Sequence, residues 1–207
     1  MSETLELVQA LGSKICHDLA GSIGTIDNCL SLLDSANEEV GDKAKKLAIA
    51  ESKKLVKTIK FIRSTYGLAD RGAKTALNDM ESILTNYFED SAIKLKTHIS
   101  DEGADIEAYL AKVAFCLISI AAESVGNEGS IDLHINLDQP NLFKIHCNGR
   151  DFQAKPESHA VLNGDDNIPL SIKNCREHYA SNICKEYGYK LSIDKSAGFT
   201  QYLVTKK

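Results

Sequence analysis

A histidine followed at once by an aspartate is the pair of residues whose chemistry is clearest in this sequence. The pair is His17 and Asp18, in a segment with helical periodicity. A neutral imidazole is nucleophilic near pH 7, because its unperturbed pKa is about 6.5. A carboxylate beside it can accept a hydrogen bond from the other ring nitrogen and so hold one tautomer. The two residues are therefore candidates for a nucleophile and the group that orients it.

The helix that must carry His17 has its apolar stripe on the other side. The stripe consists of residues three or four positions apart: Leu5, Val8, Leu11, Ile15, Leu19, Ile23, Ile26, Leu30 and Leu33. At about 100° per residue, His17 lies nearly opposite this stripe, on a face of small residues. That face comprises Ala10, Ser13, Ala20, Gly21, Gly24, Asn28 and Ser31. Glycines inside a helix each cost about 0.5–1 kcal/mol relative to alanine, so the pattern predicts close approach by another backbone.

A second long helix follows a short connection at residues 35–41. Asp42 is a plausible N-cap for it, and Tyr66 lies near its end. Its apolar face comprises Ala44, Ala48, Leu55, Ile59, Ile62 and Tyr66. Residues 1–72 are therefore expected to form an antiparallel helical hairpin. Because a hairpin cannot bury a stripe on each helix alone, we expect it to pack on the second domain or to form a four-helix bundle in a twofold homodimer.

The chain changes character from about residue 75, and residues 75–207 are expected to form a second domain. The predicted elements are a helix at 79–88, a strand at 92–99, an apolar helix at 106–125, strands at 131–137 and 142–147, a helix at 174–187 and strands at 189–193 and 200–204. Residues 148–170 are the least regular part. This order predicts an α+β fold in which helices cover one face of a mixed sheet.

Composition and charge exclude several classes of function. The chain has 207 residues and a formal charge of −5, with no basic tail, so nucleic acid is not an expected partner. No run approaches the ~20 apolar residues of a membrane helix, and the acidic start does not resemble a signal peptide. The cysteines are scattered, without metal-ligand spacing: Cys16, Cys29, Cys116, Cys147, Cys175 and Cys184. A cytoplasmic protein with reduced thiols, no metal and no membrane contact is expected.

The string from Ile15 to Leu33, ICHDLAGSIGTIDNCLSLL, resembles the ChpT family of histidine phosphotransferases. These proteins belong to the alphaproteobacterial cell-cycle phosphorelay, and the resemblance covers essentially the whole chain. It implies a dimeric helical hairpin that carries the phosphorylated histidine, followed by a domain with the α/β sandwich fold of histidine-kinase ATPases. Relatives commonly have proline five residues after that histidine. Ser22 occupies the position here, so no helix kink is expected.

The second domain lacks the residues with which such kinases bind ATP. Ala121 and Ala122 stand where an asparagine for Mg-ATP is expected. Residues 146–151 (HCNGRD) keep one glycine of the expected Asp-x-Gly-x-Gly turn and lose its aspartate. Residues 167–173 (NIPLSIK) contain no glycine where a loop must cradle phosphates. We therefore expect a degenerate domain that binds no ATP.

The resemblance implies that His17 accepts a phosphoryl group, with Asp18 beside it. The group would come from the receiver domain of a hybrid histidine kinase and pass to the receivers of response regulators. Receivers supply the Mg²⁺, so no cofactor is expected on this chain. The small-residue face and the basic second helix are expected to dock the receiver. The expected docking residues are Ser13, Lys14, Ala20, Gly21, Gly24, Asn28, Lys57 and Lys60.

Two other functions compete with this interpretation. The chain could be an active histidine kinase with a divergent nucleotide pocket, in which case ATP binding would reveal it. It could also be a non-catalytic scaffold that binds receivers without accepting phosphate. On that reading His17 is a solvated residue on an exposed helix face, and its replacement by alanine leaves function unchanged.

Overall fold

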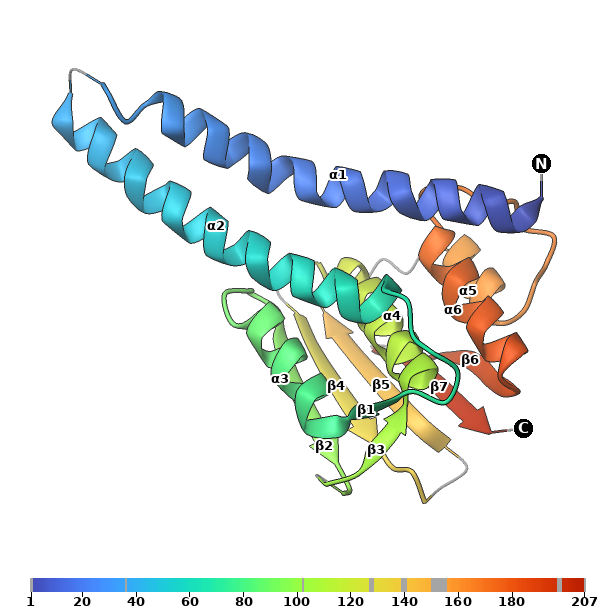
Figure 1. Ribbon diagram of the computed structural model, residues 1–207. Helices are drawn as coiled ribbons and strands as arrows, with labels where there is room; N and C mark the ends of the chain where they lie inside the picture. The colour runs from blue at the N-terminus through green and yellow to red at the C-terminus, as the bar shows by residue number, and fades with distance from the viewer. Residues whose placement is uncertain are drawn as a thin grey trace.

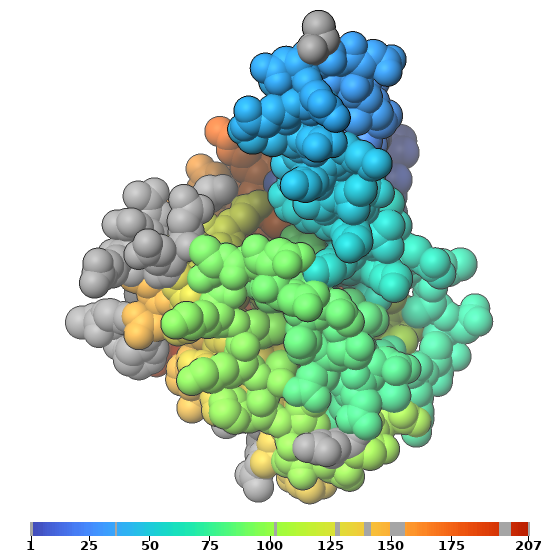
Figure 2. Space-filling view, turned by 90° about the vertical axis from the view of Figure 1, so that its left-hand side faces the viewer, coloured from blue at the N-terminus to red at the C-terminus, as the bar shows by residue number. Residues whose placement is uncertain are grey.

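Two long helices lie side by side, and the rest of the chain packs against the C-terminal half of the second and the N-terminal half of the first (Figure 1). They are α1 (Glu3–Ser31) and α2 (Glu38–Tyr66), and they confirm the predicted hairpin. The tip of the hairpin projects well beyond the remaining domain (Figure 2). The computed structural model describes residues 2–35, 37–101, 103–126, 129–138, 141–149, 156–196 and 199–206.

The second helix begins earlier than the sequence pattern predicts. Asn37 is its N-cap, since the side-chain oxygen accepts a hydrogen bond from the Glu39 N–H at 3.0 Å. The prediction that Asp42 caps this helix is wrong, because the helix runs through it. Gly41 does not break the helix either. A Cβ atom at this position would lie 3.0 Å from the Leu33 carbonyl oxygen, so glycine here allows the chain after α1 to approach α2 closely.

The domain that follows the hairpin contains four helices and two sheets among its described residues. The helices are α3 (Leu77–Phe88), α4 (Ala108–Val125), α5 (Pro156–Leu162) and α6 (Cys175–Glu186). The strands are β1 (Lys74–Ala76), β2 (Lys94–Ile99), β3 (Asp105–Glu107), β4 (Gly129–Ile135), β5 (Asn141–Gly149), β6 (Tyr189–Ser196) and β7 (Phe199–Lys206).

The larger sheet has five strands in the order β2-β4-β5-β7-β6. β2 and β4 are parallel, and the other neighbouring pairs are antiparallel. Helices α3, α4 and α6 pack on one face of this mixed sheet, between it and the hairpin (Figure 1). This is the predicted α+β arrangement. Strands β1 and β3 form a separate two-stranded sheet.

Helix α4 is the core of the second domain. It is long and apolar enough to cross a membrane by length and composition, but 78% of that stretch is buried inside the structure. Its inner residues, such as Phe115 and Ile118, are fully enclosed among the sheet and the other helices. The apolar composition of α4 is therefore explained by its central position.

Side chains from both parts of the chain meet where α2 crosses α4. Phe61 of α2 is buried, stacks on Tyr87 of α3 with ring centroids 4.2 Å apart, and meets the Phe115 ring edge-on at 5.5 Å. The Tyr179 hydroxyl of α6 donates to the Thr65 carbonyl at 3.1 Å. Since Phe61 lies in the same apolar cluster as the sheet, the end of α2 is packed into the second domain.

Three short elements were not predicted from the sequence. Strands β1 and β3 have three residues each, too few to show an alternating pattern. Helix α5 lies within the segment predicted to be least regular. Parts of three predicted turns fall outside the described residues, namely Arg150 and Asp151, Gln139 and Pro140, and Ala197 and Gly198.

Candidate functional site

His17 lies in the middle of α1 with its imidazole in solvent. Its side chain is 83% exposed, on the side of the helix that the sequence pattern predicts. The ring atom Nδ1 lies 3.4 Å from Asp18 Oδ1, close enough for a Nδ1–H group to donate to the carboxylate. In that tautomer the outer atom Nε2 carries the free lone pair. The geometry thus presents a nucleophilic nitrogen to a partner arriving from solvent.

Asp18 is held by a lysine one turn earlier in the helix. Lys14 Nζ donates to Asp18 Oδ1 at 2.9 Å, so the same oxygen faces both the ammonium group and the imidazole. Lys14 also donates to Glu123 Oε1 of α4 at 3.2 Å. Although burial lowers the pKa of Lys14, its bond to Asp18 and the charge of Glu123 outweigh this and leave the pKa above its usual value.

Glu123 in turn is paired with an arginine of α6. The Arg176 guanidinium, whose side chain is 9% exposed, forms an ion pair with Glu123 Oε1 and lies 3.5 Å from the Ser119 hydroxyl. Burial alone would raise the pKa of Glu123. The charges and hydrogen bonds of Arg176 and Lys14 have a larger opposite effect, so the pKa of Glu123 is below its usual value. A chain of charges therefore runs from the second domain to the residue beside His17.

A cleft of about 620 Å³ opens between the hairpin and the second domain on the Asp18 side of α1. Asp18 and Gly21 line it from α1, Lys54 from α2, and Glu123 and Arg176 from the second domain. His17 is not among its lining residues. The imidazole is therefore presented to solvent at the outer surface of the helix instead of being enclosed in a pocket for a small molecule.

The small residues predicted to share the His17 face are open to solvent. Ser13, Ala20, Gly21, Gly24 and Asn28 are all exposed. A Cβ atom built at Gly21 or Gly24 meets no other atom within 4 Å. Packing within this chain therefore does not require glycine at either position.

The three predicted docking lysines have different surroundings. Lys57 is partly buried and binds Glu89 at 2.7 Å and Asp90 at 2.6 Å, just after α3. Lys60 lines a groove between α2 and α3. Lys57 does not project freely, because a pair of acidic residues distant in sequence engages it. Lys14 is likewise engaged within the chain, with its side chain 18% exposed.

The sequence pattern did not predict that Glu123 and Arg176 belong to the site, nor the hydrogen bond between Ser22 and Glu51. Ser22 donates to Glu51 Oε2 of α2 at 3.0 Å, and α1 continues without interruption through this position. A signal for Glu123 was present, since it is one of only two charged residues within the apolar helix α4. Arg176 gives no such signal, because its partner lies more than fifty residues away in sequence.

The Glu123 ion pairs predict an acid-sensitive contribution to stability. Because the folded-state pKa of Glu123 is lower than the unfolded value of about 4.3, this contribution is present at neutral pH and is lost as the pH falls through the folded pKa. Glu123→Gln is expected to lower the unfolding free energy by about 1 kcal/mol at pH 7, a figure discounted for the 43% exposure of the side chain. Denaturant titrations should show the difference in unfolding free energy between wild type and Glu123→Gln shrinking as the pH is lowered below the unfolded pKa of Glu123. A difference of constant size would contradict this prediction.

Three comparisons place the chain among known proteins. A family model for the histidine phosphotransferase C-terminal domain matches residues 77–198. The chain is 25% identical over 198 residues to the protein phosphotransferase ChpT of Brucella abortus (strain 2308), covering 93% of this chain and 92% of that protein. A solved bacterial phosphotransferase superposes with a TM-score of 0.85 at 21% identity, over 99% of this chain and 98% of the other.

The fold is also similar to that of histidine kinases. The catalytic domain of the histidine kinase ThkA superposes with a TM-score of 0.50 at 14% identity, over 64% of this chain and 92% of that domain. The family model spans more than half of the 207 residues, within the domain that packs behind the His17 helix. The chain therefore belongs to the histidine phosphotransferase family.

Proposed function

We propose that the chain relays phosphoryl groups between the aspartates of receiver domains through His17. In each forward step the P–O bond of an aspartyl phosphate breaks, the lone pair of His17 Nε2 forms a P–N bond, and the carboxylate leaves with the electron pair. Transfer to a second receiver reverses these changes: the P–N bond breaks, and an aspartate carboxylate of that receiver forms the new P–O bond. The exposed imidazole, with Nδ1 beside Asp18, is the observation that carries the proposal.

A protein donor suits this site better than a small molecule. The imidazole lies on an open helix surface, and the neighbouring face of small residues allows another backbone to come close. The receiver supplies Mg²⁺, which neutralises charge on the transferred group. Among the described residues no cluster of three or more potential ligands could hold a metal ion on this chain. In this proposal the chain contributes the nucleophile and the receiver contributes the cation.

The residues at the former nucleotide site do not fit ATP. In the loop before α6, Pro169 has no N–H group, and the Ser171 N–H is donated to Asn174 Oδ1 at 2.7 Å. At these two positions the backbone amide that could face a phosphate is missing or already occupied. Arg176 at the start of α6 is tied to Glu123 of α4, across the space between the two helices. These contacts favour a relay protein over a kinase, and no step of the relay passes through ATP.

A twofold dimer would complete the hairpin. Ile23 and Leu30 of α1 and Ile59 of α2 remain between 41% and 54% exposed. Each lies about 160–180° around its helix from a residue that contacts the second domain, Lys14 on α1 or Phe61 on α2. With about 100° per residue, His17 is about 120–140° around α1 from Ile23 and Leu30. A four-helix bundle formed by two copies would cover these apolar side chains and leave the imidazole accessible.

Labelling separates the relay from its competitors. Wild-type protein is incubated with a receiver carrying radiolabelled aspartyl phosphate, and in parallel with labelled Mg-ATP alone. We expect acid-labile label from the receiver and none from ATP. Label from ATP alone would identify a kinase. Receiver binding without label would identify the scaffold.

The substitution Gly24→Ala is expected to stabilise the protein and to slow phosphoryl transfer to His17. Since a Cβ atom has open space there, the substitution should raise the unfolding free energy by about 0.5–1 kcal/mol through helix propensity. The added methyl group would hold the receiver backbone away from His17, and we expect transfer to fall by about 10-fold. Gly12→Ala is the matched control, since Gly12 also has open space but lies on another side of α1. Unchanged transfer in Gly24→Ala would contradict close approach at this face.

A further inference from the structure

Lys14 occupies an unusual place for a lysine on an exposed helix. Its ammonium group lies between two carboxylates, 2.9 Å from Asp18 and 3.2 Å from Glu123. The side chain is 18% exposed, whereas Lys43, which pairs with Glu39 on α2, is 74% exposed. The Lys14 stem is therefore packed at the junction of α1 and α4. This partly buried ammonium group has two carboxylate partners, whereas Lys43 has one.

The Asp18 carboxylate links this junction to the reacting group. Oδ1 is the atom that both Lys14 Nζ and His17 Nδ1 approach. At the far end, Arg176 fixes Glu123 from a buried position on α6. A carboxylate oriented in this way favours the proton on Nδ1 and the lone pair on Nε2. A freely rotating carboxylate does not, because an unrestrained imidazole prefers its proton on Nε2.

We propose that Lys14 is a positioning residue for the relay, held in place by Glu123 and Arg176 of the second domain. Lys14 keeps Asp18 on the Nδ1 side of His17 and thereby keeps Nε2 free to attack phosphorus. The inference rests on the proposed phosphoryl relay and gives the second domain a part in it. Helices α4 and α6 of the second domain then serve to orient the imidazole of α1.

This role differs from the docking role that the sequence predicted for Lys14. A docking lysine contributes to receiver affinity and leaves the imidazole unaffected. A positioning lysine affects the tautomer of free His17 and the rate at saturating receiver, while the dissociation constant for the receiver stays the same. The two roles therefore separate in measurements on the same variants.

The test uses the full chain in five forms: wild type, Lys14→Met, Lys14→Arg, Glu123→Gln and Lys43→Met. Nitrogen-15 NMR at alkaline pH reports the His17 tautomer, binding titrations report receiver affinity, and single-turnover labelling reports the transfer rate. We expect Lys14→Met and Glu123→Gln to shift His17 toward the Nε2–H tautomer. Both should slow transfer at saturating receiver, Lys14→Met by about 10-fold or more. Lys14→Arg retains the cation and should resemble wild type, as should the control Lys43→Met.

Two results would overturn the proposal. One is an unchanged His17 tautomer in both Lys14→Met and Glu123→Gln. The other is weaker receiver binding with an unchanged rate at saturation, which would assign Lys14 to docking. Because the tautomer is measured without phosphate, it tests the positioning role even if the wild-type chain takes no label. A wild-type chain that takes no label would contradict the relay, whereas an unchanged tautomer in the variants would contradict the positioning role, so the two results can be told apart.

Discussion

The substitution His17→Ala is expected to lower the rate of phosphoryl transfer from a phosphorylated receiver by at least about 10³-fold. The imidazole supplies the nitrogen that bonds to phosphorus, and alanine offers no nucleophile in its place. The side chain is 83% exposed, so we expect the unfolding free energy to change by no more than about 0.5 kcal/mol. Single-turnover labelling and denaturant unfolding measure the two effects separately.

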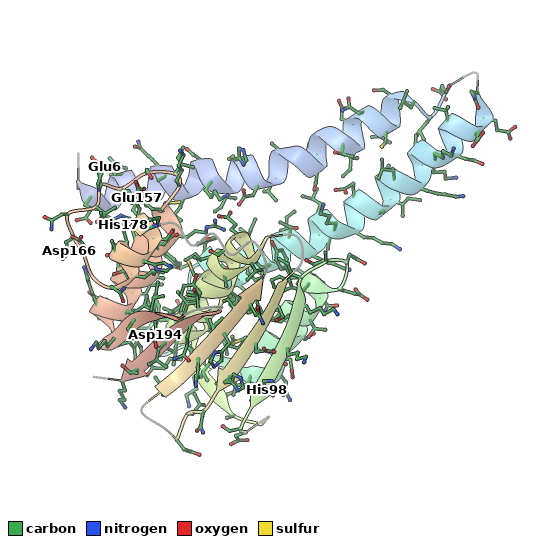
Figure 3. The ribbon with its side chains drawn as sticks, turned by 180° about the vertical axis from the view of Figure 1, so that it is seen from behind. Glu6, His98, Glu157, Asp166, His178 and Asp194 are labelled. Carbon is green, nitrogen blue, oxygen red and sulfur yellow. The ribbon has the colours of Figure 1, made fainter. Side chains whose placement is uncertain are left out.

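His98→Ala is the matched control for this substitution. His98 stacks on His134 with ring centroids 4.4 Å apart, on β2 and β4, and lies far from α1 (Figure 3). Its loss should leave transfer unchanged. Substantial labelling of His17→Ala would exclude His17 as the acceptor. Unchanged signalling by that variant in cells would favour the scaffold.

The substitution Ile23→Asp is expected to convert the proposed dimer into monomers. In the bundle, Ile23 would be covered by the second copy, and a charge buried there without a partner costs about 3 kcal/mol or more. This corresponds to a dissociation constant raised by about 100-fold or more. Sedimentation equilibrium should give twice the 22.6 kDa chain mass for wild type and a single chain mass for the variant at the same concentration.

Ala50→Asp controls for the added charge. Ala50 is also exposed, but it lies on the side of α2 roughly opposite the apolar face, so this variant should remain dimeric. A wild-type chain that sediments as a monomer at micromolar concentration would contradict the bundle. Equal dissociation of both variants would assign the effect to charge alone.

The sequence was sufficient to predict the elements whose pattern repeats over many residues. The stripe from Leu5 to Leu33 specifies α1, and the same stripe places His17 on the exposed side. The apolar run of α4 and the order of helices and strands predict the helix-covered sheet. Such patterns repeat at a fixed spacing over many residues, so a single sequence is enough to show them.

Contacts between distant segments could not be predicted in this way. Lys57 has the spacing of a solvated lysine on α2, but Glu89 and Asp90 engage it after the chain has turned through α3. The ion pair of Glu123 with Arg176 depends on how α4 and α6 pack. These pairings are set by tertiary structure, which leaves no periodic trace in the sequence.

The position of the phosphoryl group on the chain decides whether His17 is the acceptor. The chain is incubated with a phosphorylated receiver, separated from it at alkaline pH, and studied by phosphorus-31 NMR and peptide mapping. The chain has six histidines, which makes the position informative. We predict one phosphoramidate, on Nε2 of His17. A phosphoryl group on any other residue, or none on a chain that binds the receiver, would contradict the relay.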